Sequence, residues 1–220
     1  MKRAPGIFQV ILLTVGAVSA GWYGCAKLLE SVYQRSQERE LDREIAQASR
    51  IESPLSLPGD SRANVLRTSI HPNAAPQPID AVRTEMAERP GRPGLARIEI
   101  PRLGIRAMVG EGIDDRTLAL AVGHVPGTPF PGEPGNSAIA GHRDTFFRHL
   151  GGIRRDDTIR VTSSRGVFTY VVDGVEVVNP DDVEVLSPRP ESTLTLVTCF
   201  PFDYIGPAPK RFIVVAHRSS

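Results

Sequence analysis

An unbroken apolar run opens the hydrophobic pattern of this chain. It covers residues 7–26 (IFQVILLTVGAVSAGWYGCA), and its one strongly polar member is Gln9. A run of about 20 apolar residues is long enough to cross the hydrocarbon core of a membrane as a helix. Basic residues precede it, and Trp22 and Tyr23 lie near its far end, which favours an N-terminus on the cytoplasmic side. We therefore predict a membrane anchor over residues 1–27.

Two other interpretations of this run stay open. Val18, Ser19 and Ala20 resemble a small-residue cleavage site, so the run is also compatible with a secretory signal peptide that is removed. The third interpretation is a buried helix of a soluble protein. The first two place everything beyond residue 30 outside the cytoplasm.

The two segments that follow differ from the anchor and from each other. Residues 28–51 mix charges with few Pro and Gly, and their apolar residues recur at helical spacing, which predicts a membrane-proximal helix. Residues 52–95 hold seven prolines among Ser, Asn, Ala and Gln, with few large apolar residues. Such a segment cannot build a core of its own and is typical of a stalk or linker.

Short alternating runs bounded by Gly or Pro fill residues 96–220, and this is the pattern of β-strands joined by turns. Strands are predicted at residues 96–100, 103–109, 137–140, 158–162, 167–178, 193–199 and 212–216, with a bulge at Gly174. Many short strands without a long amphipathic helix favour an all-β fold, a closed or nearly closed barrel.

Two short helices and one long loop complete this prediction. Asp114 or Asp115 is expected to cap a helix that ends near Ala121, and Asp144 with Thr145 is expected to cap a second one over residues 146–150. Residues 123–135 (GHVPGTPFPGEPG) are predicted to form an ordered loop.

Composition narrows the function classes. The 26 basic and 25 acidic residues leave a net charge of +1, so no strong field favours nucleic acid. The chain has only two cysteines, which form neither a disulfide framework nor a zinc-binding spacing. The acidic residues Asp181, Asp182 and Glu184 are interpreted as a solvated loop, with calcium binding there a weaker hypothesis.

Cys199 is the strongest candidate for a catalytic residue. It ends the predicted strand TLTLVTC and is followed at once by Phe200 and Pro201, so its thiol is held on a rigid element beside a turn. A lone thiol is unusual outside the cytoplasm, where cysteines are oxidised or paired. The alternative is a small apolar residue that finishes a core strand. A nucleophilic role requires an imidazole or a guanidinium nearby.

Five histidines compete to supply that imidazole: His71, His124, His142, His149 and His217. His142 is favoured, because it ends a strand of small residues that keep its ring accessible for general acid–base work. His124 is the reserve candidate, although a loop-ordering role competes. Arg211 opens the returning strand and is the candidate for holding an oxyanion or a substrate carbonyl, against the ordinary role of a surface charge.

Three separated motifs resemble the sortase family, and class D sortases in particular. TLTLVTC at 193–199 is similar to the signature of the sortase catalytic strand, GHRDT at 141–145 to the catalytic-histidine segment, and Lys210, Arg211 and Phe212 to the segment of the active-site arginine. The likeness covers residues 96–217. It implies a barrel of about eight strands and a catalytic set of Cys199, His142 and Arg211, with Thr198 and His124 assigned to substrate binding.

The resemblance also implies a reaction. Cys199 would attack the peptide carbonyl after the Thr of an LPxTA-like or LPxTG-like C-terminal sorting signal on a surface protein, and form a thioester. An amine of peptidoglycan or of a pilin would then take the acyl group, with no metal or organic cofactor. A thiol hydrolase of the same fold and a non-catalytic anchored peptide-binding barrel are the alternatives. An L,D-transpeptidase is disfavoured, because its SHGC-type motif is absent.

Overall fold

The computed structural model describes residues 7–52 and 96–219. Its elements are α1 (Ile7–Glu52), β1 (Ala96–Ile100), β2 (Ile105–Glu111), α3 (Asp115–Leu120), β3 (Val122–His124), β4 (Asn136–Ala140), β5 (Thr158–Ser163), β6 (Gly166–Val178), β7 (Thr193–Phe200) and β8 (Lys210–Arg218). Three short 3-10 helices lie between them: η1 (Pro101–Leu103), η2 (Leu150–Gly152) and η3 (Val183–Leu186). Apart from Glu52, the predicted stalk lies outside the described residues, and so does His71 within it.

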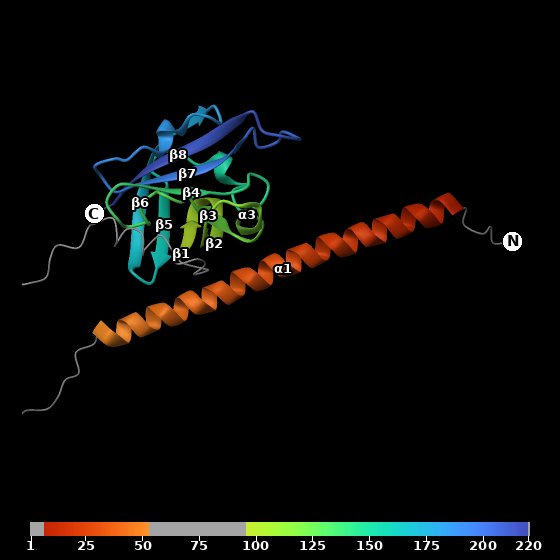
Figure 1. Ribbon diagram of the computed structural model, residues 1–220, viewed down its shortest axis with the longest axis horizontal. Helices are drawn as coiled ribbons and strands as arrows, with labels where there is room; N and C mark the ends of the chain where they lie inside the picture. Colours follow the sequence, from red (N-terminus) through yellow and green to blue (C-terminus); the bar gives the residue numbers. More distant parts are fainter. Residues whose placement is uncertain (1–6, 53–95, 220) are drawn as a thin grey trace, which may run out of the picture.

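The eight strands form a closed barrel in the order β1-β2-β3-β4-β7-β8-β6-β5, which confirms the fold class (Figure 1). The pairs β2–β3 and β4–β7 are parallel, and the other neighbours are antiparallel. Closure leaves no free sheet edge along the barrel. The pair β4–β7 matters most for function, because it sets two chain segments that are distant in sequence side by side.

Alternation along the strands fills the barrel interior. Successive side chains of a strand point to opposite faces, so every second residue lines the core. In β7 these are Leu194 and Leu196, and in β8 they include Val214 and Ala216, all fully buried. The odd-numbered positions of β7 and β8 therefore face outward, whereas Thr198 lies on the inner side with Leu194 and Leu196.

Two local expectations are confirmed. The Asp114 side chain accepts hydrogen bonds from the backbone N–H groups of Arg116 and Thr117, as an N-cap of α3 should. The pairing of β6 with β8 shifts register between Val172 and Gly174, where the bulge was predicted.

Two other local expectations are wrong. The Gly/Pro-rich passage is not loop throughout, because its first two residues belong to β3, which pairs with β2 and β4. Residues 146–149 form turns instead of a helix, and the buried hydroxyl of Thr145 has no hydrogen-bond partner in the described structure, so it caps nothing. Gly151 and Gly152 follow directly in η2, so the segment after Thr145 is too short for a stable α-helix.

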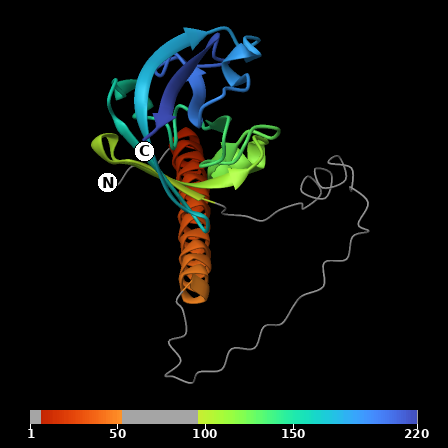
Figure 2. The same ribbon diagram turned by 90° about the vertical axis from the view of Figure 1, so that its left-hand side faces the viewer.

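Helix α1 is a single continuous element of 46 residues that passes along the barrel (Figures 1 and 2). Among the described residues it is the one helix long and apolar enough to cross a membrane. Its second half contacts the barrel at β2 and α3, where Leu41 is fully buried. The anchor and the membrane-proximal helix of the sequence prediction are thus one helix, docked on the barrel by its C-terminal half.

Candidate active site

The reactive candidates stand on, or just after, three neighbouring strands. In the barrel order β4, β7 and β8 are adjacent, and β7 lies in the middle. Cys199 lies near the end of β7, and its register partner on β8 is Arg211. Side chains of directly opposed residues in an antiparallel pair project from the same face with their Cβ atoms about 5 Å apart. Thiol and guanidinium therefore start from neighbouring positions on one face.

That face is the outside of the barrel. Leu194 and Leu196 point inward, so the odd-numbered position of Cys199 points outward. Cys199 is a free thiol and is half-buried, hence neither sealed in the core nor fully solvated. Its side chain thus lies on the outer face of β7, partly open to solvent.

His142 reaches the same face from β4. The parallel pairing places Ala140 beside Val197, and the Gly141 backbone N–H donates to the Val197 carbonyl oxygen at 3.0 Å. His142 follows Ala140 by two residues, as Cys199 follows Val197, so the two stand at matching positions just beyond the paired part of the two strands. His142 is half-buried, so its ring has solvent access. Imidazole, thiol and guanidinium thus follow one another across three strands.

A side-chain hydrogen bond ties the histidine segment to the cysteine strand. Thr198 is buried, and its hydroxyl donates to the Gly141 carbonyl oxygen at 2.7 Å. Gly141 itself has no room for a side chain, because a Cβ there would lie 2.7 Å from the Phe147 ring. The backbone before His142 is therefore held from two sides.

Arg143 fixes the loop that follows the cysteine strand. Its guanidinium donates to the carbonyl oxygens of Pro201 at 3.1 Å, Tyr204 at 2.7 Å and Gly206 at 2.9 Å, and it lies 5.9 Å from the centre of the Tyr204 ring. The residue next to His142 thus holds the β7–β8 loop next to Cys199. Sequence reasoning missed this contact, since its partners are backbone carbonyls that no motif reveals.

Arg211 keeps most of its donors available. Its Nη1 donates to the carbonyl oxygens of Lys210 at 3.1 Å and Ala208 at 3.4 Å. Within residues 7–52 and 96–219, no carboxylate forms a salt bridge with it. A guanidinium without a paired carboxylate can serve a developing oxyanion.

His124 is buried beside the site, and only 2% of its surface is exposed. Its Nδ1 lies 2.9 Å from Glu111 Oε2, its Nε2 lies 3.0 Å from the Pro129 carbonyl oxygen, and its ring stacks on Phe130. Burial alone lowers the pKa of His124, but the hydrogen bond and charge of Glu111 outweigh it, so the pKa is raised. The protonated ring can then donate from both nitrogens and order the loop over residues 125–135.

The remaining candidates lie away from Cys199. His149 is exposed, and His217 at the far end of β8 has its Nδ1 2.7 Å from an Asp173 carboxylate oxygen. The acidic residues Asp181, Asp182 and Glu184 are exposed around η3.

The Sortase domain family model matches residues 98–219, the whole described barrel except its first residues. The chain belongs to the sortase family. It is 38% identical over 122 residues to Sortase D of Bacillus subtilis (strain 168), a match that covers 55% of this chain and 62% of that relative. The chain thus spans less than two thirds of this sortase.

Solved sortase structures agree with the fold. The Sortase D5 transpeptidase of Clostridium perfringens is similar with a TM-score of 0.55 at 30% identity, over 64% of this chain and 88% of that chain. Sortase C-1 of Actinomyces oris is similar with a TM-score of 0.57 at 26% identity, over 83% of this chain and 99% of that chain. The likeness covers the sortase barrel on which the three candidate residues are placed.

Proposed function

We propose that this sortase is a cysteine transpeptidase that cleaves a C-terminal sorting signal after its Thr and transfers the new carboxyl end to an amine. The observation that carries the proposal is the order of His142, Cys199 and Arg211 across the outer face of β4, β7 and β8. Nucleophile, acid–base group and fixed cation are the parts that acyl transfer needs. A similar C. perfringens structure carries the name transpeptidase.

The proposed reaction has two halves. The Cys199 sulfur attacks the carbonyl carbon of the Thr, the C–N bond breaks, and His142 gives a proton to the leaving amine. The resulting thioester is attacked by an incoming amine, which passes a proton to His142 as the C–S bond breaks and the thiolate returns. In each half the negative charge that grows on the carbonyl oxygen is stabilised by Arg211.

Thr198 and His124, first assigned to substrate binding, are proposed to act as positioning residues. Both are buried, and both bond within the chain, Thr198 to Gly141 and His124 to Glu111 and Pro129. Thr198 holds the backbone before His142, and His124 holds the loop after β3. Their effect on substrate would be indirect.

We further propose that α1 anchors the enzyme in the cytoplasmic membrane, with the barrel outside the cell. The apolar half of the helix continues into the half that docks on the barrel, so anchor and catalytic domain form one body. The proposed partners are surface proteins with LPxTA-like or LPxTG-like signals, and an amine of peptidoglycan or of a pilin as acceptor.

Ligation of short peptides tests the reaction. The full chain in detergent would be incubated with LPxTA or LPxTG peptides and triglycine, and mass spectrometry would follow the adduct on Cys199 and the ligated peptide. We expect both species in the wild type, neither in Cys199→Ala, and no ligated product in His142→Ala. His149→Ala, which removes an exposed imidazole outside the site, is the matched control and should ligate normally.

Two outcomes would contradict the proposal in different ways. Cleavage that triglycine never diverts into a ligated product would indicate a hydrolase. No adduct on Cys199 with either peptide, in a protein that remains folded, would refute the nucleophile and leave only the fold.

A further inference from the structure

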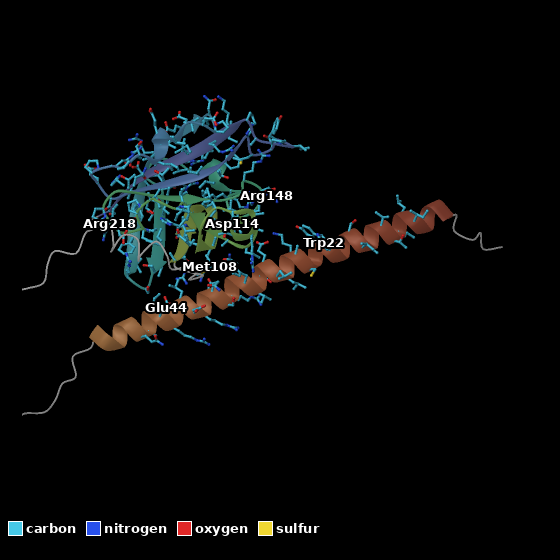
Figure 3. All side chains as sticks on the ribbon, viewed as in Figure 1. Trp22, Glu44, Met108, Asp114, Arg148 and Arg218 are labelled. Atoms are coloured by element: carbon cyan, nitrogen blue, oxygen red, sulfur yellow. The ribbon has the colours of Figure 1, made fainter. Side chains whose placement is uncertain are left out.

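Helix α1 is fastened to the barrel by specific polar contacts. The β2–β3 pairing begins at Val109, so the backbone N–H of Met108 lies just beyond it. Gln34 accepts from that N–H at 2.8 Å and donates to the Leu120 carbonyl oxygen at 2.6 Å. One side chain of α1 thus completes the backbone bonding of β2 and α3, and Met108 lies on the side of the barrel that faces α1 (Figure 3).

A second contact prevents α1 from rotating about Gln34 against the barrel. Arg106 donates to Glu38 at 2.7 and 2.9 Å, one helical turn beyond Gln34, and Leu41 is fully buried a further turn on. Three contacts spread over two turns fix both the position and the direction of the helix against the barrel. The direction of the barrel relative to the anchor is thereby set.

The catalytic end of the barrel is the end turned toward the apolar half of α1. A polar groove of about 500 Å³ separates this end from α1. Its lining includes Arg148 and His149 of the barrel and Lys27 and Glu30 of α1. Lys27 is the first residue after the apolar run, so this part of the barrel is level with the point where that run ends. In Figure 3 Arg148 lies at the end of the barrel nearer Trp22, and Arg218 lies at the opposite end.

The β7–β8 loop projects from that same end. β7 starts beside Arg218, whose backbone N–H donates to the Ser192 carbonyl oxygen, and therefore finishes at the other end (Figure 1). At the tip of the loop Ile205 is 95% exposed and Tyr204 48% exposed. The guanidinium of Arg143 holds the carbonyls on both sides of Ile205, so this apolar side chain is presented to the surroundings.

The surface around this tip suits a lipid interface. Tyr is favoured at the level of lipid headgroups, where its ring is apolar and its hydroxyl is wet. Arg148 and His149 are exposed nearby and can approach phosphates, while Asp144 and Asp203 are also exposed there. These side chains carry little net charge together. The apolar tip of the loop is therefore the main source of attraction to the lipid.

We infer that the catalytic end of the barrel rests on the lipid surface in which α1 is anchored. Tyr204 and Ile205 enter the interfacial layer, and Arg148 and His149 lie against headgroup phosphates. This inference rests on the proposed membrane anchoring. Its consequence is that Cys199 meets its substrate at about the height of the headgroups, so the enzyme captures peptide segments close to the membrane.

Depth-dependent quenching tests the contact on the full chain in vesicles of phosphatidylcholine and phosphatidylglycerol. With Cys25→Ser and Cys199→Ala as background, an environment-sensitive fluorophore is placed by Ile205→Cys, or by Glu191→Cys at the opposite end. Spin-labelled lipids should quench the fluorophore at position 205 several-fold more than the one at 191. The single tryptophan, Trp22, reports in the same sample whether α1 is inserted.

Each result decides between the claims. Equal quenching at positions 205 and 191 with quenched Trp22 overturns the inference and leaves the anchoring intact. Unquenched Trp22 overturns both. Gln34→Ala combined with Glu38→Ala should lower quenching at 205 without changing Trp22, and no change at 205 would contradict the role of docking. Peptide ligation, measured on protein that retains Cys199, reports on the chemistry separately.

Discussion

The two ends of the β7–β8 pair differ in how far they depend on side-chain hydrogen bonds. At the Thr193 end, main-chain groups bond to each other, Thr193 N–H to the Gly135 carbonyl at 2.8 Å and Arg218 N–H to the Ser192 carbonyl at 2.9 Å, and the Arg218 guanidinium adds a side-chain bond to the Gly132 carbonyl. At the Cys199 end, side chains hold main-chain groups through Arg143 and Thr198. Backbone bonds persist when side chains change, whereas the bonds at the catalytic end depend on residue identity.

This difference separates stability from activity. The Thr193 end positions none of Cys199, His142 and Arg211, so its side chains should affect the enzyme through unfolding alone. The catalytic end carries a loop of nine residues between β7 and β8, and its shape depends on one guanidinium. Mutations at the two ends should therefore separate these two effects.

The largest expected effect comes from Arg143→Ala. The β7–β8 loop loses three hydrogen bonds and a ring contact, so the loop that follows Cys199 loses its defined shape. We expect kcat/KM for peptide ligation to fall by roughly 100-fold. A misplacement of catalytic groups by about 1 Å can cost that much, even when the mutated residue does not touch the reacting atoms. The melting temperature should change little, because the bonds lost lie in a surface loop.

Arg218→Ala is the matched control at the other end. Arg218 donates to the Gly132 carbonyl oxygen at 2.9 Å and lies 5.0 Å from the centre of the Phe168 ring, so it also joins a guanidinium to a loop and an aromatic ring. Its loss should leave kcat/KM unchanged. If the two alanine variants lower kcat/KM equally, the contrast between the ends is wrong.

Thr198→Val should have an intermediate effect. The substitution keeps the shape of the side chain but removes the donor to the buried Gly141 carbonyl, which leaves that acceptor unsatisfied at a cost of about 1–3 kcal/mol in unfolding free energy. Thermal unfolding measures this loss, and ligation rates should also fall because the backbone before His142 is released.

Thr198→Ser restores the hydroxyl and should recover most of the ligation rate. The control Thr158→Val replaces an exposed threonine of β5 and should be neutral. A Thr198→Val enzyme that is both as stable and as active as the wild type would remove this bond from the description of the site.

The sequence predicted those parts of the molecule that depend on alternation and on chain breakers. The strands around Cys199 and Arg211 alternate regularly and are bounded by Pro, so their ends could be placed to within two residues. β3 was missed because three residues carry no period, and the strand exists only through its partners β2 and β4. The turns after Thr145 were mistaken for a helix, because a capping residue followed by apolar residues does not reveal that its hydroxyl will be buried.

Contacts between side chains and distant backbone could not be predicted. Arg143 bonds to a main-chain carbonyl 58 residues away, and Gln34 bonds to one 86 residues away. Every residue has a main-chain carbonyl, so the sequence does not reveal which one is bonded. Apart from the buried Leu41, the docking of α1 and the clamp on the β7–β8 loop therefore leave no mark in the hydrophobic pattern. The register of β4 against β7, which brings His142 and Cys199 to matching positions, is likewise a property of the closed barrel.

The smallest expected effect concerns His124, whose loop leads to the backbone-bonded end. Because its pKa in the folded protein is raised above the ordinary value of about 6.5, its charged pairing with Glu111 stabilises the fold fully below that pH. This contribution is lost as the pH rises through the raised pKa. The melting temperature of the wild type minus that of His124→Asn should therefore fall from mildly acidic to alkaline pH. A difference that stays constant with pH would mean that the loop is held by neutral hydrogen bonds.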